Sequence, residues 1–268
     1  MMDSSHHDWE RAQDYFHSDP LKYLVHLKYM HLYGDSIMVS FLERDGKSSV
    51  LLRYPSARVV WDANAYPMTE QVFLPAADDA EMAQVLLEYM RDSGLLDRSQ
   101  VIKFSDAATE KVMCDELNLE FARSLTSYTS SSDARFEADP EVVIESQPRE
   151  SHIEAFLDNG YSREEIAADF AKGAILFSLY DGEALLSSCM TYQNFDDLWE
   201  IAGVHTADLA RRKGYARRVV LTALHDVLQK GFVPRYHVED VNKASHQLAQ
   251  GLGLKSCLHF THYVYQPI

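Results

Sequence analysis

The sequence predicts an α/β fold, with helices packed on a mixed sheet, and two observations lead to this class. Runs of strand character alternate with runs of helical spacing along the whole chain. Two of the strand runs contain Asp-Gly turns, at Asp45-Gly46 and Asp181-Gly182, which are strong hairpin signals. With 268 residues, 46% hydrophobic and 25% charged, the composition is that of a soluble globular protein with one large or two small domains.

The first half is predicted to alternate between helices and strands. Its first helix starts at Asp19, which can cap it, and Pro20 fits the first helical position. An acidic residue pair caps the helix that ends at Gly94. The predicted elements are helix 18–30, a hairpin over 36–54, a strand "ARVVWDA" over 57–63, helix 78–94, strand 100–104, helix 106–118 and strand 120–129.

The amino-acid composition of the chain changes over residues 130–148. This stretch contains serines, acidic residues and two prolines, which is typical of an inter-domain connection, and it includes one short strand. We place the boundary within about 130–145. The prediction is an N-terminal domain over 1–135 and a C-terminal domain over 136–268.

The second half is predicted to start with helices and to continue with strands and helices in alternation. A long helix follows a basic run and ends at Gly231. The predicted elements are helices 148–160 and 162–173, a hairpin over 174–193, strand 198–206, a helix to Gly231, strand 234–240, a capped helix over 242–253 and a closing strand over 256–266.

The two halves resemble each other. When residues 106–128 are placed over 241–263, Leu117 falls on Leu252, Leu119 on Leu254 and Tyr128 on Tyr263 without a gap. Each segment is a predicted helix, a tight turn and a strand, which indicates a duplication. The first half has no basic glycine-containing loop at the matching place, so only the second half is expected to keep a site.

Charge and cysteine content exclude several classes of function. The chain has 41 acidic and 25 basic residues, so we expect neither nucleic acid nor an anionic membrane as a partner. Cys114, Cys189 and Cys257 form no CxxC pair, which predicts a reduced, cytoplasmic protein without a cysteine metal site. His6 and His7 are expected to be surface residues near a frayed end, and no metal is predicted.

The basic run "RRKGYA" (residues 211–216) is the main functional signal. It lies between a predicted strand and a long helix, and the unpaired N–H groups at a helix start favour anions. Gly214 and the small Ala216 let a ligand approach the main chain, and the cations at Arg211, Arg212 and Lys213 add attraction. A diphosphate suits such a site. Arg217 and Arg218 are expected to face water or a further phosphate.

Together with the downstream "NKASHQLAQGLGL", this run resembles the GCN5-related N-acetyltransferase (GNAT) superfamily. The acyl-CoA loop of that family is similar to residues 211–216, and its second motif resembles Asn242, Ser245, Leu248 and Gly253-Leu254. The similarity covers about 150–268 and looks closest to the FR47-like and glycine-acyltransferase-like branches. It implies a GNAT fold in the C-terminal half and a degenerate GNAT-like half before it.

The resemblance implies acetyl-CoA as co-substrate and assigns residues to it. In the family, the strand before the loop holds the pantetheine arm through backbone groups, and the Asn of the second motif also contacts that arm. By this carry-over the acyl-CoA ligands are Val204, His205, Thr206, Arg211, Arg212, Lys213, Gly214, Tyr215, Ala216, Asn242 and Ser245. One departure is clear: many members have a proton-donating Tyr where this chain has Ala249, so the general acid must come from elsewhere.

Candidates for the catalytic groups follow from the predicted strands. Glu200 is the first candidate for general base, and strand alternation places it on one face with Ala202, Val204 and Thr206. His205 and His237 are alternative bases, because a neutral imidazole suits this role near pH 7. Tyr263 in the closing strand is a candidate proton donor, and Ser245 and His246 lie near the position of the missing Tyr.

Two functions remain open from the sequence. The first is an N-acyltransferase, by expectation an acetyltransferase, in which the amine of a small molecule or amino acid attacks acetyl-CoA directly in a ternary complex. The amino group at a protein N-terminus is a further acceptor that the sequence leaves open. The second is a non-catalytic acyl-CoA sensor. This alternative remains because Ala249 stands where the family usually has its proton-donating Tyr. A monomer or homodimer is expected.

Overall fold

A computed structural model describes residues 3–267, and its packing divides the chain into two units. Unit 1 contains the described residues up to Thr126 and from Leu258 onward, and unit 2 contains Ser127–Cys257. The sequence places the boundary at 135/136 and gives the whole C-terminus to the second domain. The contacts instead assign the end of the last strand to unit 1, where Thr261 pairs with Phe104.

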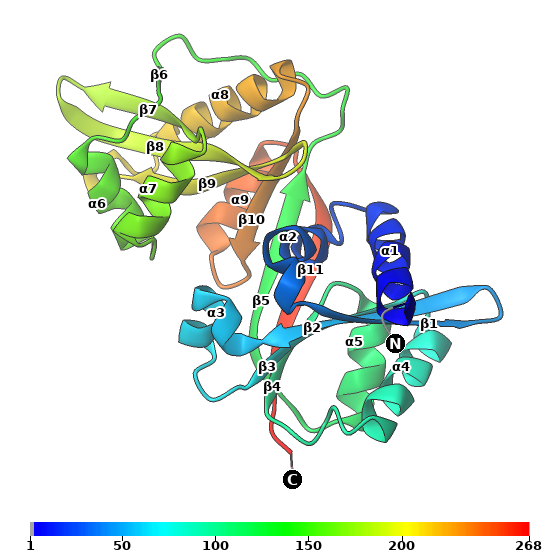
Figure 1. Cartoon of the computed structure of the whole chain (residues 1–268). Coiled ribbons are helices and arrows are strands. Elements are labelled where there is room, and N and C mark those ends of the chain that lie inside the picture. Colours follow the sequence, from blue (N-terminus) through cyan, green and yellow to red (C-terminus); the bar gives the residue numbers. More distant parts are fainter. Residues whose placement is uncertain (1–2, 268) are drawn as a thin grey trace. The chain divides into compact units, whose positions relative to one another are not determined.

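Unit 1 is built on a mixed sheet with strand order β1-β2-β3-β4-β11-β5. The pairs β1–β2, β2–β3 and β4–β11 are antiparallel, and β3 and β4 are parallel. Its elements are α1 (Asp3–His17), α2 (Leu24–Tyr33), β1 (Met38–Arg44), β2 (Lys47–Pro55), α3 (Val60–Ala65), β3 (Gln71–Ala77), α4 (Ala80–Asp92), β4 (Gln100–Phe104), α5 (Ala107–Glu116) and β5 (Leu119–Thr129), with part of β11 (Lys255–Tyr265) (Figure 1).

The first half differs from the predicted elements at three places. Residues 3–17 form helix α1, where we expected a frayed end. Helix α2 starts at Leu24, later than the predicted cap at Asp19. Residues 60–65 of the predicted strand "ARVVWDA" form helix α3, because Asp62 is fully buried and is held by Lys103 and by the Tyr54 hydroxyl. A buried ion pair outweighs the strand preference of two valines.

Unit 2 has strand order β5-β10-β9-β8-β7-β6, in which β9 and β10 pair parallel and the pairs β6–β7, β7–β8 and β8–β9 are antiparallel. It agrees closely with the elements predicted for the second half. The elements are β6 (Val143–Glu145), α6 (Glu150–Asp158), α7 (Arg163–Ala171), β7 (Ile175–Asp181), β8 (Ala184–Phe195), β9 (Leu198–Thr206), α8 (Tyr215–Gln229), β10 (Val233–Glu239) and α9 (Lys243–Gly251), together with the ends of β5 and β11.

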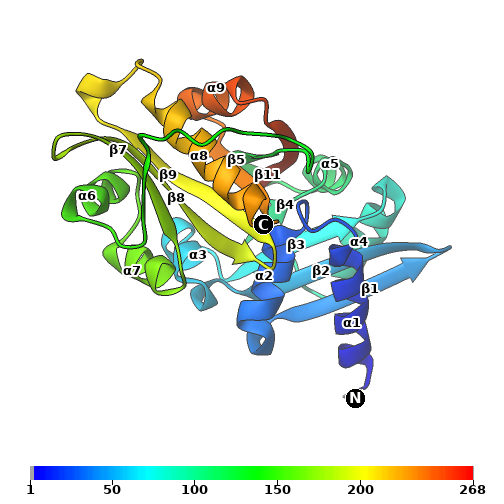
Figure 2. The same cartoon turned by 90° about the horizontal axis from the view of Figure 1, so that it is seen from above.

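Helices cover both faces of the unit 2 sheet, and alternation along the strands explains the two cores. Leu176 and Met190 pack with Phe156 of α6 and Ile166 of α7. Their strand neighbours, such as Phe177 and Cys189, pack instead with Val220 of α8. Figure 2 shows α6 and α7 on one side of β7–β9 and α8 on the other. We call these the α6/α7 face and the α8 face.

The two units repeat one order of elements. A hairpin, a strand, a helix, a strand, a helix and a strand follow one another as β1-β2-β3-α4-β4-α5-β5 and as β7-β8-β9-α8-β10-α9-β11, apart from α3. In unit 1 the parallel pairing of β3 with β4 stops at Phe73↔Ile102, although both strands continue. This order agrees with the duplication inferred from the sequence.

Candidate functional site

The candidate site lies in unit 2, where the parallel strands β9 and β10 part. Their pairing runs from Leu198↔Val233 to Ile201↔Tyr236 and stops there. Strand β9 nevertheless continues to Thr206 and β10 to Glu239. The last residues of the two strands therefore do not pair with each other. Because the strands are parallel, both carboxyl ends lie at the same edge of the sheet, where ligands of α/β proteins commonly bind.

A β-bulge at Gly203 accompanies this separation. Strand β9 pairs with β8 at Ala202↔Met190 and at His205↔Ser188, so Gly203 and Val204 together face the single residue Cys189. Gly203 has φ of 60°, a left-handed conformation that favours glycine. A Cβ atom there would lie 2.5 Å from a ring carbon of Phe156. The bulge bends β9 and shifts its alternation by one residue.

The shifted alternation corrects the predicted common face of Glu200, Ala202, Val204 and Thr206. Ala202 packs into the core of the α6/α7 face, whereas Val204 packs against the core of the α8 face. The parity change instead places His205 on the face of Glu200. Burial lowers the pKa of the His205 imidazole, and the charge of Asp158 in α6 acts in the opposite direction.

We expect Gly203→Ala to destabilise the protein by roughly 1–3 kcal/mol, because the new methyl group overlaps Phe156 and the backbone is left-handed. Urea unfolding measures the free energy. The matched control is Gly182→Ala, with φ of 59° and no atom within 4 Å of the new methyl group. Equal losses of unfolding free energy in the two variants would show that the Phe156 ring moves aside at no energetic cost.

The start of α8 has the features of an anion site. Gly214 is the N-cap of α8, with φ of 83°, so no side chain at this position accepts from the first N–H groups of the helix. The first turn of α8 contains no acidic residue. Arg212 also has a positive φ, of 62°. The N–H groups of the first helical turn have no partner within the helix, and the helix dipole adds positive potential there. This end of α8 follows the carboxyl end of β9.

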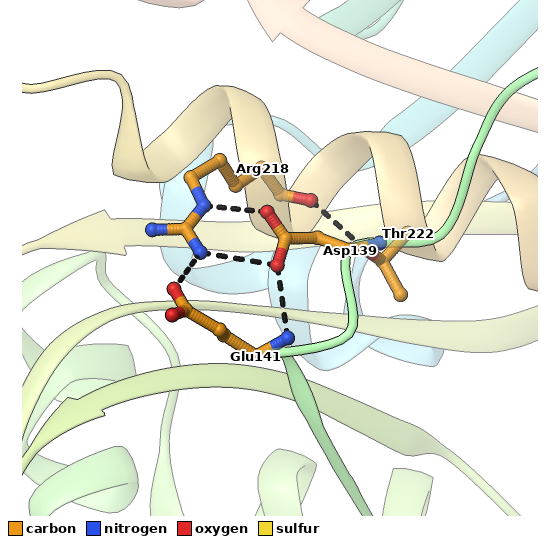
Figure 3. A network of polar contacts seen from close by, with 4 residues as sticks. All are labelled: Asp139, Glu141, Arg218 and Thr222. Atoms are coloured by element: carbon orange, nitrogen blue, oxygen red, sulfur yellow. Dashed lines mark hydrogen bonds and ion pairs between the residues drawn. The ribbon is translucent and has the colours of Figure 1, made fainter.

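Two cations beyond the loop are already engaged, contrary to the expectation that they face water or a phosphate. Arg218 donates to both Asp139 oxygens at 2.6 and 3.0 Å and also to Glu141 (Figure 3). These bonds hold the pKa of the Asp139 carboxyl below its usual range. Arg217 donates to the Gly251 carbonyl at 2.7 Å. Both side chains therefore stabilise unit 2.

The remaining cations of the run are exposed. Arg211 forms an ion pair with Asp208 at 2.8 Å and donates to the Thr206 carbonyl at 3.2 Å. Arg212 and Lys213 are exposed, and neither has an ion pair or hydrogen bond with another described residue. Lys213 and Tyr215 line a pocket of about 860 Å³, which residues of β7 and β8 such as Tyr180 and Leu185 also line. Glu200 and His237 are not among its lining residues.

Helix α9 begins beside the carboxyl end of β10. Asn242 caps it, with its side-chain oxygen accepting from the Ser245 N–H at 3.1 Å. Ser245 is also hydrogen-bonded to the phenol of Tyr236, the last residue of β10 that pairs with β9. Burial raises the pKa of Tyr236 to about 12. Ala249 is fully buried in the same core cluster as Tyr236.

A buried polar network links Glu200 and His237. Arg235 is 3% exposed and donates to Glu200 at 2.8 Å and to the Nδ1 atom of His237 at 2.9 Å. Asn194 also donates to Glu200, at 2.8 Å. The Glu200 carboxylate is thus a counter-ion, and the Nδ1 lone pair of His237 is occupied. Both contacts oppose a role as general base. The sequence analysis missed Arg235, although a cation inside an apolar strand was a visible signal.

The structure does not place Tyr263 with these residues. It belongs to unit 1, where its hydroxyl donates to Glu110 at 2.9 Å and its ring packs with Phe104 and Phe121. Among residues 3–267, no group of three or more His, Cys, Asp or Glu side chains could hold a metal ion. In the same range, no helix is both long and apolar enough to cross a membrane.

Comparisons with known proteins identify the family and the fold. A family model described as GNAT acetyltransferase matches residues 59–263, so the match extends well before the motifs. A GNAT-family acetyltransferase of Colwellia psychrerythraea has TM-score 0.56 at 11% identity, covering 92% of this chain and 97% of its own. A GCN5-related N-acetyltransferase of Sphaerobacter thermophilus has TM-score 0.53 at 9% identity, covering 82% and 77%. No curated protein matches.

Proposed function

Because this chain belongs to the GNAT acetyltransferase family, we propose that it transfers an acetyl group from acetyl-CoA to the amine of a small molecule or amino acid. The amine nitrogen bonds to the acetyl carbon, and the carbon–sulfur bond breaks. The amine loses a proton, and the thiolate gains one. The observation that carries the proposal is the parting of β9 and β10 next to the cationic start of α8.

The residues present suit acyl-CoA. The unpaired N–H groups at Tyr215 and Ala216 and the free cations Arg212 and Lys213 fit a diphosphate. The backbone of Val204, His205 and Thr206, which β10 does not pair, fits the amide groups of the pantetheine arm. Asn242 and Ser245 stand at the matching end of β10. Acyl-CoA supplies the thioester, and these residues would position it.

We assign the proton-accepting role to His205. Its pKa is lowered by burial, so the imidazole is neutral near pH 7. Its ring forms no hydrogen bond with another described residue, whereas Glu200 and His237 are engaged with Arg235. A neutral imidazole on the α6/α7 face can accept the amine proton directly or through water.

We assign the proton-donating role to Tyr236, in place of the tyrosine absent at Ala249. The Tyr236 phenol lies at the last pair before the strands part, and Ser245 holds it at the start of α9. Its raised pKa keeps the hydroxyl protonated near pH 7, which a proton donor requires.

We expect Tyr236→Phe to lower kcat about tenfold with little change in KM for acetyl-CoA, because a thiolate is a fair leaving group even without an acid. Steady-state thiol release measures both constants. Tyr265→Phe, in unit 1, is the control and should leave kcat unchanged. A Tyr236→Phe enzyme with full kcat would remove Tyr236 from the mechanism.

The proposed acceptor is a small cationic amine or an amino acid. The chain has formal net charge −16, which attracts cations and opposes nucleic acid. Near His205, Asp158 supplies a carboxylate that can hold a protonated amine before it is deprotonated. The acidic composition also supports a role away from anionic membranes. We propose a monomer or homodimer as its state.

The test is thiol release from acetyl-CoA in the presence of amino acids, polyamines and short peptides with free N-termini. We expect one class to stimulate release and to gain an acetyl group by mass spectrometry. His205→Gln should lose most of this activity while binding CoA normally. If the wild type binds CoA but no amine stimulates release, the enzyme proposal fails.

A non-catalytic acyl-CoA sensor is the second candidate. It is favoured by the occupied carboxylate of Glu200 and the occupied Nδ1 of His237, and by the apolar Ala249 at the family's proton-donor position. The same assay separates the two functions, since a sensor binds CoA and releases no thiol with any amine.

A further inference from the structure

A second pocket lies in unit 1, around the edge strand β1. It has a volume of about 640 Å³, and five consecutive residues of β1, Met38–Leu42, line it. Because consecutive strand residues point to opposite faces, this lining shows that the pocket wraps around the free edge of the strand. The other lining residues are His6, Asp8 and Trp9 of α1, Ile37, Arg53 of β2 and Tyr89 of α4.

Arg53 is the exceptional residue of this pocket. Its Nε atom is buried without a hydrogen-bond partner, and the guanidinium forms no ion pair with another described residue. Among the described residues, the two fully buried cations both face a carboxylate, Lys103 with Asp62 and Arg235 with Glu200. Burial lowers the pKa of Arg53, and the nearby Tyr89 phenol acts in the opposite direction. A half-buried unpaired guanidinium costs stability, which a bound anion would recover.

The rest of the lining specifies the kind of anion. Trp9, Met38 and Phe41 offer apolar and aromatic surface. The hydroxyls of Ser40 and Tyr89 lie 2.9 Å apart and form a hydrogen bond, so the hydroxyl that accepts in this bond can donate its own proton to a carboxylate oxygen. Asp8 also lines the pocket, and its negative charge disfavours a dianion such as a phosphate.

We propose that this pocket binds a small organic carboxylate with an apolar or aromatic body, whose carboxylate group pairs with Arg53. The site lies wholly in unit 1, so the proposal does not depend on acetyl transfer. It assigns a ligand-binding role to the half of the chain that lacks the basic loop.

Calorimetry on the full chain tests this with phenylacetate and hexanoate as probes, against their neutral amides and inorganic phosphate. We expect each carboxylate to bind roughly tenfold or more tightly than its amide, as a charge-assisted hydrogen bond would give. Phosphate should bind more weakly than either carboxylate. Equal affinities for acid and amide, or no binding of the acids at millimolar concentration, would overturn the proposal.

Two variants of Arg53 locate the effect. Arg53→Met should abolish the preference for the acid and raise the melting temperature, because it removes an unpaired, partly desolvated charge. Arg53→Gln should also abolish the preference for the acid over the amide, without the stability that the apolar methionine side chain adds. Arg44→Met, at the exposed end of β1, is the control and should keep the preference. A retained preference in Arg53→Met, or a lowered melting temperature in both variants, would assign Arg53 a structural role instead.

Discussion

Gly214→Asp is expected to reduce acyl-CoA affinity by about 10³-fold, the largest effect on binding that we predict. An added carboxylate about 4 Å from the diphosphate costs about 4 kcal/mol at the effective dielectric constant of a protein surface. The position is open, since no atom lies within 4 Å of an added Cβ, so the side chain enters the space where a ligand would lie. Its φ of 83° adds backbone strain. Calorimetric titration with CoA measures the loss.

Gly231→Asp is the matched control for this variant. Gly231 follows the opposite end of α8, with φ of 78° and no atom within 4 Å of an added Cβ. It carries the same strain and the same charge away from the loop, so CoA affinity should be unchanged. If Gly214→Asp binds CoA as well as Gly231→Asp does, the diphosphate does not bind at the start of α8.

Arg235→Met is expected to lower the free energy of unfolding by roughly 3–5 kcal/mol, because it leaves the buried Glu200 carboxylate without its counter-ion. The side chains of both partners are 4% exposed, so water cannot replace the lost contact. The Nδ1 atom of His237 also loses a donor. Urea unfolding, followed by circular dichroism, measures the change.

A double variant separates the ion pair from general packing. Arg235→Met with Glu200→Gln should recover much of the loss, since the second change removes the unpaired charge. Arg163→Met provides an exposed comparison, because Arg163 pairs with Glu150 at 2.6 Å while both side chains are more than half exposed. We expect at most about 1 kcal/mol there. A loss in Arg235→Met that Glu200→Gln leaves unchanged would contradict the coupling.

Unit 1 repeats the backbone plan of the site but not its chemistry. Its parallel strands β3 and β4 part after Phe73↔Ile102, as β9 and β10 do after Ile201↔Tyr236. The helix that follows β3 is capped by Asp79, which accepts from Met82 N–H, and Glu81 lies in its first turn. These carboxylates occupy the place of the basic run and repel a diphosphate. Unit 1 therefore has the same strand and helix arrangement without a site for a diphosphate at this helix start.

Much of the fold was predictable because its elements depend on residues that are close together in the sequence. The elements of the second half, the glycine turn of "RRKGYA" and the cap at Asn242 follow from hydrophobic spacing and from residues with a fixed backbone role. The failures have tertiary causes. Residues 60–65 form a helix because Asp62 is buried in an ion pair with Lys103. Lys103 is distant from Asp62 in the sequence, so the residues around Asp62 do not indicate this pairing.

The sequence by itself determined the α/β class, the repeated order of elements and the glycine turn that starts α8, since these depend on spacing and composition along one stretch of chain. Only the tertiary structure decided which side chains remain free. The bulge at Gly203 moved Val204 to the α8 face, and Arg235 engaged Glu200 and His237. Arg218 pairs with Asp139, while Arg53 has no hydrogen bond or ion pair with another described residue. Ion pairs join residues distant in sequence, so the charge available at a site is a property of the folded chain.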